Sequence, residues 1–570
     1  MGKDQDLHTA ARTLLAFSAR AGIRYMFTNL GSDHPAFIEA FAVMQKRGEP
    51  MPKIVVCPHE MTALSAAHGY AMVTRQPQLV LVHVDVGTQN LGGSVHNAAR
   101  GRVPAIVIAG LSPVTDGVDR VGTRNEFIHY IQDMTRQQEI VAPYMKWCYE
   151  LRAPESMESV MARAIQISTT PPEGPVYITG AREFWEGTTP PVTEHLEDWP
   201  VSQLGGLSKD SVAELYQALI ASERPIVITS YLGRQPRAVE LLVELSERIG
   251  IGVCEVSPAY MNFPGRHEHH LGYRRNSLVD EADLILMLDV DVPWIKTKVQ
   301  PRRDARLFHV DIDPLKTGLG YWHFPAQRIH QADSCATLEQ LSEMVEANSP
   351  GRQSRVDWIA SVRRRTQPTA NAAEEGAITA EELTEAVSEL ITDRTVVLFE
   401  APTCTELIPG ILKLSQPSSY FNSGGAGLGW CINATIGAKL ARPDAEVIAL
   451  VGDGCYLFGV PSSAYWVANA YQTPFLTVIY NNGGWNAPKH STLAVHPEGN
   501  AKQNDTYWVT VGAGARLADI AAAAGNAEPF HVSNRKELRD TLRRALQTVR
   551  DGRSAVVDVA IQRISSQVLK

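Results

Sequence analysis

The sequence predicts an α/β protein made of three doubly wound, parallel-sheet domains. Short and continuously apolar segments, such as 79–84 and 395–400, alternate with helical patterns such as 59–74. Strands that are covered on both faces need apolar residues throughout, and the alternation of strands with helices is typical of parallel sheets. The length of 570 residues also corresponds to about three or four domains.

The predicted strands are spread over the whole chain. They are 53–57, 79–84, 105–110, 225–230, 284–290, 307–313, 395–400, 447–452, 475–481 and 555–561. Helical patterns lie between them, for example over 59–74 and 335–348. Two segments without apolar periodicity, 184–208 and 350–376, predict linkers. They divide the chain into expected domains at 1–190, 205–345 and 375–570.

Composition excludes several classes of protein. With 44% hydrophobic and 20% charged residues the chain is an ordinary globular one. A net charge of −9 disfavours nucleic-acid binding, which needs clustered positive charge. The seven scattered cysteines indicate a reducing compartment and no disulfide scaffold. No apolar run approaches the ~18 residues of a membrane span, and no signal peptide is recognisable. We therefore expect a soluble, cytoplasmic protein without a membrane partner.

Polar residues follow two neighbouring apolar strands of the third domain. Segment 447–452 leads into Gly452-Asp453-Gly454, and 475–481 leads into Asn482-Gly483-Gly484. Carboxyl ends of parallel strands meet at one edge of a sheet, where ligands bind. Carboxylate and amide oxygens are hard ligands suited to Mg²⁺, and N–H groups at a helix start, here that of Cys455, can bind phosphate. A helix-capping aspartate is the alternative for the GDG triplet alone.

The pair of motifs resembles the signature of thiamine-diphosphate-dependent enzymes, a GDG followed by NN. The resemblance implies that Asp453, Asn482 and the carbonyl oxygen of Gly484 hold Mg²⁺. It also implies that Gly452, Gly454 and Cys455 contact the cofactor, with Trp485 beside the metal loop. The 29 positions from Asp453 to Asn482 exceed the usual spacing, which indicates an insertion within GVPSS (459–463).

A glutamate opens the helical segment 59–74. By itself Glu60 could be a carboxylate that stabilises the helix start. The sequence from Glu60 to Tyr70 resembles the family's glutamate followed by small residues and GYA. The resemblance implies that Glu60 contacts the aminopyrimidine ring of thiamine diphosphate in the active site of a partner subunit. It therefore implies a homodimer at least, and we expect a homotetramer.

Two further segments of the third domain resemble cofactor loops of the family. Residues 420–438 are similar to the glycine-rich loop of acetohydroxyacid synthases and benzoylformate decarboxylase. There a bulky residue beneath the cofactor enforces its bent shape, a role that falls to Leu428, with Gly427 beside it. Residues 400–405 resemble the other diphosphate loop, which suggests Pro402 and Thr403. A dinucleotide fingerprint is absent, because Trp430 stands where its third glycine belongs.

Two residues of the first domain are candidates for substrate handling. Ser32 lies in GSDHP (31–35), and His83 lies near the carboxyl end of segment 79–84. Benzoylformate decarboxylase has a serine and a histidine in similar settings, and a neutral imidazole could shuttle protons there. The alternatives are a turn serine and a satisfied core histidine. The second histidine of that enzyme has no match in 288–298.

The second domain, 205–345, resembles the family's six-stranded central domain. Segment 307–318 is similar to a segment that holds FAD in acetohydroxyacid synthases. The other FAD segments, and the arginine that lyases direct at coenzyme A, are not recognisable. We therefore expect a central domain without a cofactor that packs subunits together.

The resemblance implies a thiamine-diphosphate- and Mg²⁺-dependent 2-oxo acid decarboxylase, similar to benzoylformate decarboxylase. It would release an aldehyde, or join the product to a second carbonyl compound as a 2-hydroxy ketone. The alternatives are an acetolactate-synthase-like carboligase and a lyase of hydroxy ketones or 2-hydroxyacyl-CoA. A non-catalytic subunit is disfavoured because Glu60, Asp453 and Asn482 are all present. A nicotinamide oxidoreductase is disfavoured by the missing fingerprint.

Overall fold

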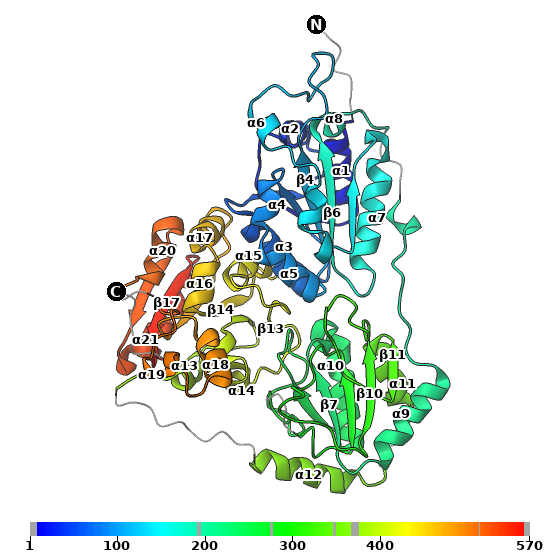
Figure 1. Cartoon of the computed structure of the whole chain (residues 1–570), viewed down its shortest axis with the longest axis vertical. Coiled ribbons are helices and arrows are strands. Elements are labelled where there is room, and N and C mark those ends of the chain that lie inside the picture. Colours follow the sequence, from blue (N-terminus) through cyan, green and yellow to red (C-terminus); the bar gives the residue numbers. More distant parts are fainter. Residues whose placement is uncertain are drawn as a thin grey trace.

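The computed structural model contains three parallel β-sheets flanked by helices, which confirms the predicted fold class. It describes residues 8–190, 195–273, 278–345, 349–365, 376–511 and 514–563. Figure 1 shows the N-terminal sheet in blue and cyan at the top, the central sheet in green at the lower right, and the C-terminal sheet in yellow to red at the left. The strands of the three sheets lie within the three predicted domains, whose exact limits stay a prediction.

The N-terminal sheet has the order β2-β1-β3-β4-β6-β5, and every pairing in it is parallel. Its strands are β1 (Tyr25–Thr28), β2 (Lys53–Val56), β3 (Leu79–Val82), β4 (Ala105–Leu111), β5 (Trp147–Glu150) and β6 (Pro175–Ala181). The helices are α1 (Ala10–Arg20), α2 (Pro35–Arg47), α3 (Glu60–Thr74), α4 (Val86–Asn90), α5 (Gly93–Arg100), α6 (Ile128–Ile131), α7 (Met157–Thr169) and α8 (Arg182–Trp185).

The central sheet has the order β11-β10-β9-β7-β8. Its strands are β7 (Pro225–Thr229), β8 (Gly252–Glu255), β9 (Leu284–Leu288), β10 (Arg306–Asp311) and β11 (Arg328–Gln331), with helices α9 (Lys209–Ala221), α10 (Pro236–Ile249), α11 (Ser334–Met344) and α12 (Arg352–Arg365). Six strands were expected for this sheet, and the described residues form five. A single parallel bridge from Val253 to His270 stands where another strand would extend the sheet beyond β8.

The C-terminal sheet has the order β13-β12-β14-β15-β17-β16. Its strands are β12 (Thr395–Glu400), β13 (Tyr420–Phe421), β14 (Glu446–Gly452), β15 (Leu476–Asn481), β16 (Glu528–Val532) and β17 (Ala555–Ala560). The helices are α13 (Ala380–Ser388), α14 (Leu407–Leu412), α15 (Cys431–Ala441), α16 (Asp453–Phe458), α17 (Pro461–Ala470), α18 (Asn486–Val495), α19 (Asn500–Gln503), α20 (Leu517–Gly525) and α21 (Leu538–Arg550).

The predicted linker 350–376 contains a helix, α12, which the sequence analysis missed. Its buried positions, Arg355, Ile359 and Val362, recur at helical spacing. The guanidinium of Arg355 donates to the carbonyl oxygen of Ile249 at 2.8 Å and so ties α12 to the end of α10. Basic and polar residues around these three positions hid the pattern. Residues 366–375 lie outside the described part of the chain.

Helices α3 and α15 join the N-terminal and C-terminal domains within the chain. A Cβ atom on Gly437 would lie 2.6 Å from the amide nitrogen of Tyr70, and one on Gly69 would lie 2.7 Å from the carbonyl carbon of Ala434. The two backbones therefore meet at a pair of glycines. Nearby, the hydroxyl of Thr62 donates to that of Ser463 at 2.9 Å. Because α3 is covered on all sides, nearly all of its residues are buried.

Candidate active site

A cavity of about 920 Å³ lies at the carboxyl edge of the C-terminal sheet. β12, β14 and β15 are neighbours there, and the chain changes direction across the sheet between β12 and β14. Open α/β sheets bind ligands at this position. The structure brings together at this cavity all the C-terminal residues that the sequence predicted, namely Pro402, Thr403, Gly427, Leu428, Gly452, Asp453, Gly454, Cys455, Asn482, Gly484 and Trp485.

Asp453 presents a buried oxygen without a protein partner to this cavity. Its Oδ1 accepts a hydrogen bond from the N–H of Gly454 at 2.7 Å, while Oδ2 has no partner among the described residues. Burial raises the pKa of Asp453 to about 6, although N–H groups of Gly454, Gly484 and Gly483 oppose the shift. A buried carboxylate is costly unless a cation or hydrogen bonds compensate it. The site therefore fits a cation.

The loop after β15 supplies the other oxygens that suit a cation. The side chain of Asn482 accepts from the N–H of Gly484 at 3.3 Å, which fixes its amide oxygen within the loop. The N–H of Trp485 donates to the carbonyl oxygen of Val509 at 2.7 Å. Carboxylate, amide and carbonyl oxygens form a hard donor set of the kind that Mg²⁺ prefers. The described residues contain no cluster of three or more His, Cys, Asp or Glu side chains that could hold a softer metal.

Glu400, at the end of β12, is a cavity residue that the sequence analysis did not single out. Its carboxylate accepts the N–H groups of Gly429 and Cys431, each at 2.6 Å. Complete burial raises the pKa of Glu400 to about 8 in spite of these hydrogen bonds. The two bonds fix the backbone that follows Leu428 and begins α15. The position of Glu400 at the end of an apolar strand was the only sequence signal for a role in the site. Its hydrogen-bond partners could not be predicted, because they lie some 30 residues further along the chain.

The N-terminal candidates form a second cluster at the carboxyl edge of their own sheet. Glu60, at the start of α3, is buried, and its Oε2 accepts a hydrogen bond from Nδ2 of Asn90 at 3.1 Å. His83, directly after β3, forms an ion pair through Nδ1 with Asp33. Ser32 is exposed and precedes Asp33 in the chain.

Asp33 controls the protonation of His83. Its Oδ2 accepts the N–H of Val84 at 3.0 Å, which fixes the carboxylate beneath the ring. Burial alone would lower the pKa of His83, but the hydrogen bond and the charge of Asp33, followed by the charge of Glu60, raise it above its ordinary value. The pairing with Asp33 therefore stabilises the protonated form of the imidazole, a contact that the sequence did not reveal. Asp33 was missed because its partner lies 50 positions away.

The two clusters are separate within one chain. Among the described residues that line the cavity, all but Ser257 belong to the C-terminal domain, and Glu60, His83 and Ser32 are not among them. The N-terminal domain nevertheless reaches the cavity rim, because Asn97 on α5 bonds to the backbone of Gly427. No helix in the described ranges has the length and apolar character needed to cross a membrane.

Comparisons with known proteins point to one family. Three family models match: "Thiamine pyrophosphate enzyme, N-terminal TPP binding domain" at residues 8–140, the central domain at 212–341, and the C-terminal TPP binding domain at 403–559. Benzoylformate decarboxylase of Pseudomonas aeruginosa is 26% identical and covers 98% of this chain and 99% of its own. Acetolactate synthase of Mycobacterium leprae is 26% identical over 75% of this chain and 69% of its own.

Solved structures share the fold along the whole length. The thiamine diphosphate-dependent 4-hydroxybenzoylformate decarboxylase of Rhodococcus jostii RHA1 has a TM-score of 0.80 at 23% identity, over 98% of this chain and 100% of its own. Benzoylformate decarboxylase of Polynucleobacter necessarius has a TM-score of 0.80 at 20% identity, over 99% and 100%.

Proposed function

The chain belongs to the thiamine pyrophosphate enzyme family, and we propose that it is a Mg²⁺-dependent 2-oxo acid decarboxylase. Its cofactor would be thiamine diphosphate, which is another name for thiamine pyrophosphate. His83, which is paired with Asp33 and lies beside Glu60, carries the decarboxylase part of the proposal. An imidazole that is held by a carboxylate can orient a 2-oxo acid by hydrogen bonding and can later deliver a proton. The full-length similarity to a benzoylformate decarboxylase supports the same activity.

The cavity residues have complementary tasks in this proposal. Asp453, Asn482 and the carbonyl oxygen of Gly484 would hold Mg²⁺, which fits the unpartnered Oδ2 of Asp453. N–H groups at the start of α16, including that of Cys455, would meet the diphosphate together with Gly452 and Gly454. Pro402, Thr403 and Trp485 would complete the wall, since they line the same cavity.

Two residues would set the shape and the reactivity of the cofactor. Leu428, with Gly427, would lie beneath it and keep it bent, and Glu60 would contact its aminopyrimidine ring. When bound, thiamine diphosphate supplies an electron sink for the carbon atom that loses carbon dioxide. The protein supplies orientation, exclusion of water and the proton from the pair formed by Asp33 and His83.

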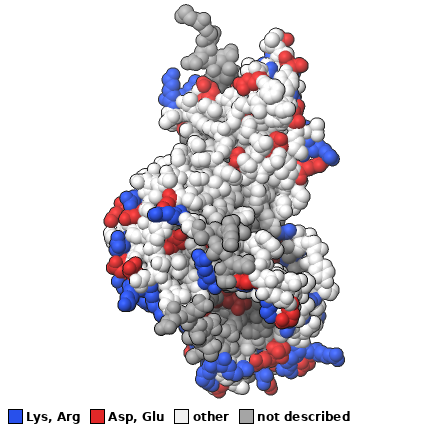
Figure 2. Space-filling view, turned by 60° about the vertical axis from the view of Figure 1, so that its left-hand side comes forward, with Lys and Arg blue, Asp and Glu red and all other residues white. Residues whose placement is uncertain are grey.

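The separation of the two clusters within a chain supports a site that two subunits share, in a homodimer or a homotetramer. Figure 2 shows few charged side chains across much of the upper half of the face that it draws, where a second copy could pack. Mixing Glu60→Gln with Asp453→Ala chains tests this arrangement. If sites are shared, mixed dimers contain one intact site, and about a quarter of the wild-type activity returns when chains exchange at random. No recovery would mean that each chain completes its own site.

A substrate assay separates the decarboxylase from a carboligase. We expect benzoylformate, branched 2-oxo acids or pyruvate to yield carbon dioxide and the aldehyde, in the presence of Mg²⁺ and thiamine diphosphate. Formation of 2-hydroxy ketones as the main products would favour the second candidate, a carboligase, which the similarity to acetolactate synthases supports. Cleavage of hydroxy ketones or 2-hydroxyacyl-CoA would identify a lyase. Failure to bind the cofactor under any divalent ion would refute the proposal as a whole.

A further inference from the structure

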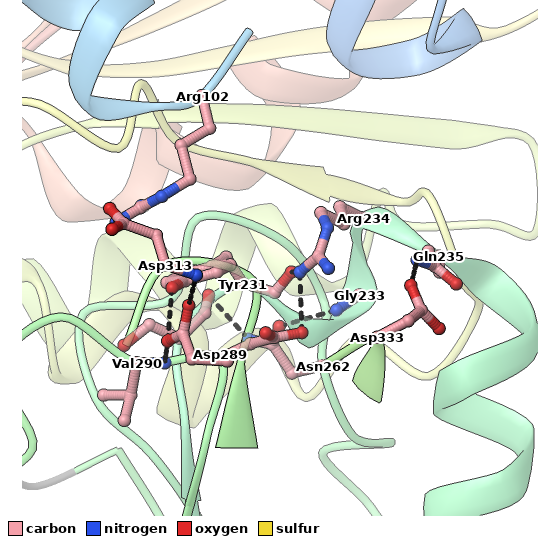
Figure 3. A network of polar contacts seen from close by, with 12 residues as sticks. Arg102, Tyr231, Gly233, Arg234, Gln235, Asn262, Asp289, Val290, Asp313 and Asp333 are labelled. Atoms are coloured by element: carbon pink, nitrogen blue, oxygen red, sulfur yellow. Dashed lines mark hydrogen bonds and ion pairs between the residues drawn. The ribbon is translucent and has the colours of Figure 1, made fainter. Parts of the chain in front are cut away.

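The carboxyl edge of the central sheet carries a charged cluster that the proposed reaction does not use. β7, β9 and β10 are neighbours, and the chain changes direction between β7 and β9. This is the position where open α/β sheets bind ligands. Asp311 ends β10, and Tyr231, Asp289, Asp291 and Asp313 follow these strands. Figure 3 shows Tyr231, Asp289 and Asp313 close to one another.

Side chains of the central domain itself neutralise part of this acidic edge. Nζ of Lys316 donates to Oδ2 of Asp311 at 2.7 Å and lies 3.0 Å from Oδ1 of Asp291. Nη1 of Arg234 donates to Oδ2 of Asp289 at 2.6 Å. All these groups except Asp291 are almost completely buried, and buried charges are tolerated only when they are paired.

An arginine from the N-terminal domain meets the remaining negative charge. Nη2 and Nη1 of Arg102 donate to the two carboxylate oxygens of Asp291 at 2.7 and 3.2 Å, and Nη2 lies 3.4 Å from Oδ2 of Asp313. The guanidinium lies 4.5 Å from the ring centre of Tyr231 (Figure 3). Burial would raise the pKa of Asp291, but the charges of Arg102 and Lys316 lower it. A bidentate pair of this kind is among the stronger polar contacts.

Arg102 stands at a corner that touches the glycine-rich cofactor loop. It follows the end of α5 and has a φ of 53°, which is uncommon for a residue with a side chain and indicates that its contacts hold it. The preceding residue, Gly101, lies directly against the loop. A Cβ atom on Gly101 would lie 2.5 Å from the carbonyl oxygen of Ser423, and one on Gly424 would lie 2.7 Å from the Cα atom of Gly101.

One turn earlier on α5, Asn97 grips the same loop. Its Nδ2 donates to the carbonyl oxygen of Gly427 at 2.8 Å, and its Oδ1 accepts the N–H of Gly427 at 2.9 Å. On the other side of Leu428, the carboxylate of Glu400 holds Gly429. Leu428 therefore lies between two backbone segments that are fixed from different domains.

We propose that Arg102 is a positioning residue: its grip on Asp291 at the edge of the central sheet keeps α5 against the loop 423–428 and so sets the place of Leu428. Arg102 of the N-terminal domain thus contacts the carboxyl edge of the central sheet, where open α/β sheets bind ligands. The role of Leu428 rests on the proposed function, whereas the coupling from Asp291 to the loop is a property of the protein without cofactor.

Hydrogen exchange of the full-length, cofactor-free protein tests the coupling. We expect the amides of 423–429 to exchange about tenfold faster in Arg102→Met than in the wild type. Asp291→Asn should have a similar effect, although no contact joins Asp291 to the loop among the described residues. The double variant should exchange no faster than Arg102→Met alone, because the pair between Arg102 and Asp291 is already absent in Arg102→Met. Asp291→Asn carries the test by itself if Arg102→Met fails to fold.

Arg234→Met is the matched control. It removes an arginine that is more buried than Arg102 from an ion pair that stays within the central domain, and it should destabilise that domain while exchange in 423–429 is unchanged. Unchanged loop exchange in both Arg102→Met and Asp291→Asn, or an equal increase in Arg234→Met, would overturn the inference.

Cofactor affinity gives a second and separate measurement. With Mg²⁺ present, the dissociation constant of thiamine diphosphate, followed by tryptophan fluorescence, should rise about tenfold in Arg102→Met and less in Arg102→Lys. Faster loop exchange in a protein whose wild type binds no thiamine diphosphate would uphold the coupling and refute the proposed function. An unaltered dissociation constant in Arg102→Met would refute the effect on Leu428.

Discussion

The contact between α3 and α15 makes Gly437→Ala a quantitative test of the structure. The new Cβ atom would lie 2.6 Å from the amide nitrogen of Tyr70 and closer still to the carbonyl oxygen of Ala66. Both are backbone atoms, so no side-chain rotation relieves the overlap and the helices must separate. Alanine gains about 1 kcal/mol over glycine in a helix, but overpacking of a close interface costs about 1–3 kcal/mol and sometimes more. Because the overlap is with backbone atoms, we expect a cost at the upper end of that range, about 3 kcal/mol, and therefore a net loss of about 2 kcal/mol.

Thermal unfolding followed by circular dichroism measures the effect. For domains of this size, a loss of about 2 kcal/mol corresponds to a decrease of about 4–8 °C in the melting temperature. Gly410→Ala in α14 is the matched control, because the nearest atom to its new Cβ is 3.8 Å away, on Tyr273. There the helix propensity acts alone, and the melting temperature should stay the same or rise. A change of less than about 1 °C in the melting temperature corresponds to almost no loss of stability. Such a result for Gly437→Ala would refute the close approach of the two helices.

Three further changes test the two clusters. The pKa of Asp453 in the folded protein is about 6, above that of an exposed aspartate, so its contribution to stability is present at low pH and is lost as the pH rises through 6. The melting temperature of the cofactor-free protein should therefore fall from about pH 4 to about pH 6, less so in Asp453→Asn, and Mg²⁺ with thiamine diphosphate should remove the fall. Glu60→Gln should bind the cofactor normally yet slow deuterium exchange at its C2 atom by at least about 100-fold; normal exchange seen by NMR would exclude the proposed contact. Asp33→Asn removes the charge that raises the pKa of His83, so the limb of the pH profile of kcat/KM that His83 sets should move to lower pH; an unmoved profile would separate His83 from catalysis.

Sequence patterns predicted the parts of the molecule that local chemistry determines. All ten expected strands are present, because continuous burial leaves an apolar run that is easy to recognise. The C-terminal cavity residues also follow from short motifs, since sheet geometry alone brings the ends of β12, β14 and β15 together. The strands that were missed are short or lie near sheet edges, such as β13 with two residues and the largely exposed β11.

Residues whose partners are distant along the chain could not be predicted in this way. Asn97 meets Gly427 across 330 positions, and Arg102 meets Asp291 across 189. Each is an ordinary polar residue near the end of an ordinary helix, and no spacing rule links it to its partner. The first contact joins the N-terminal and C-terminal domains and the second joins the N-terminal and central domains, so both are properties of the assembled fold.

The titration behaviour of the two clusters has one common physical cause. Asp453 is buried, and none of the residues that the structure describes bonds to its Oδ2, while Glu60 is a second buried carboxylate, whose charge supports the protonation of His83. In the N-terminal cluster Asp33 is paired with His83, whereas one oxygen of Asp453 has no such partner, and an uncompensated buried charge is kept only where a ligand offsets its cost. A cation at Asp453 would lower the pKa of that carboxylate and stabilise the C-terminal domain by mass action. Binding and stability should therefore rise together with Mg²⁺ concentration in the wild type, and they should do so in no variant that lacks the carboxylate of Asp453.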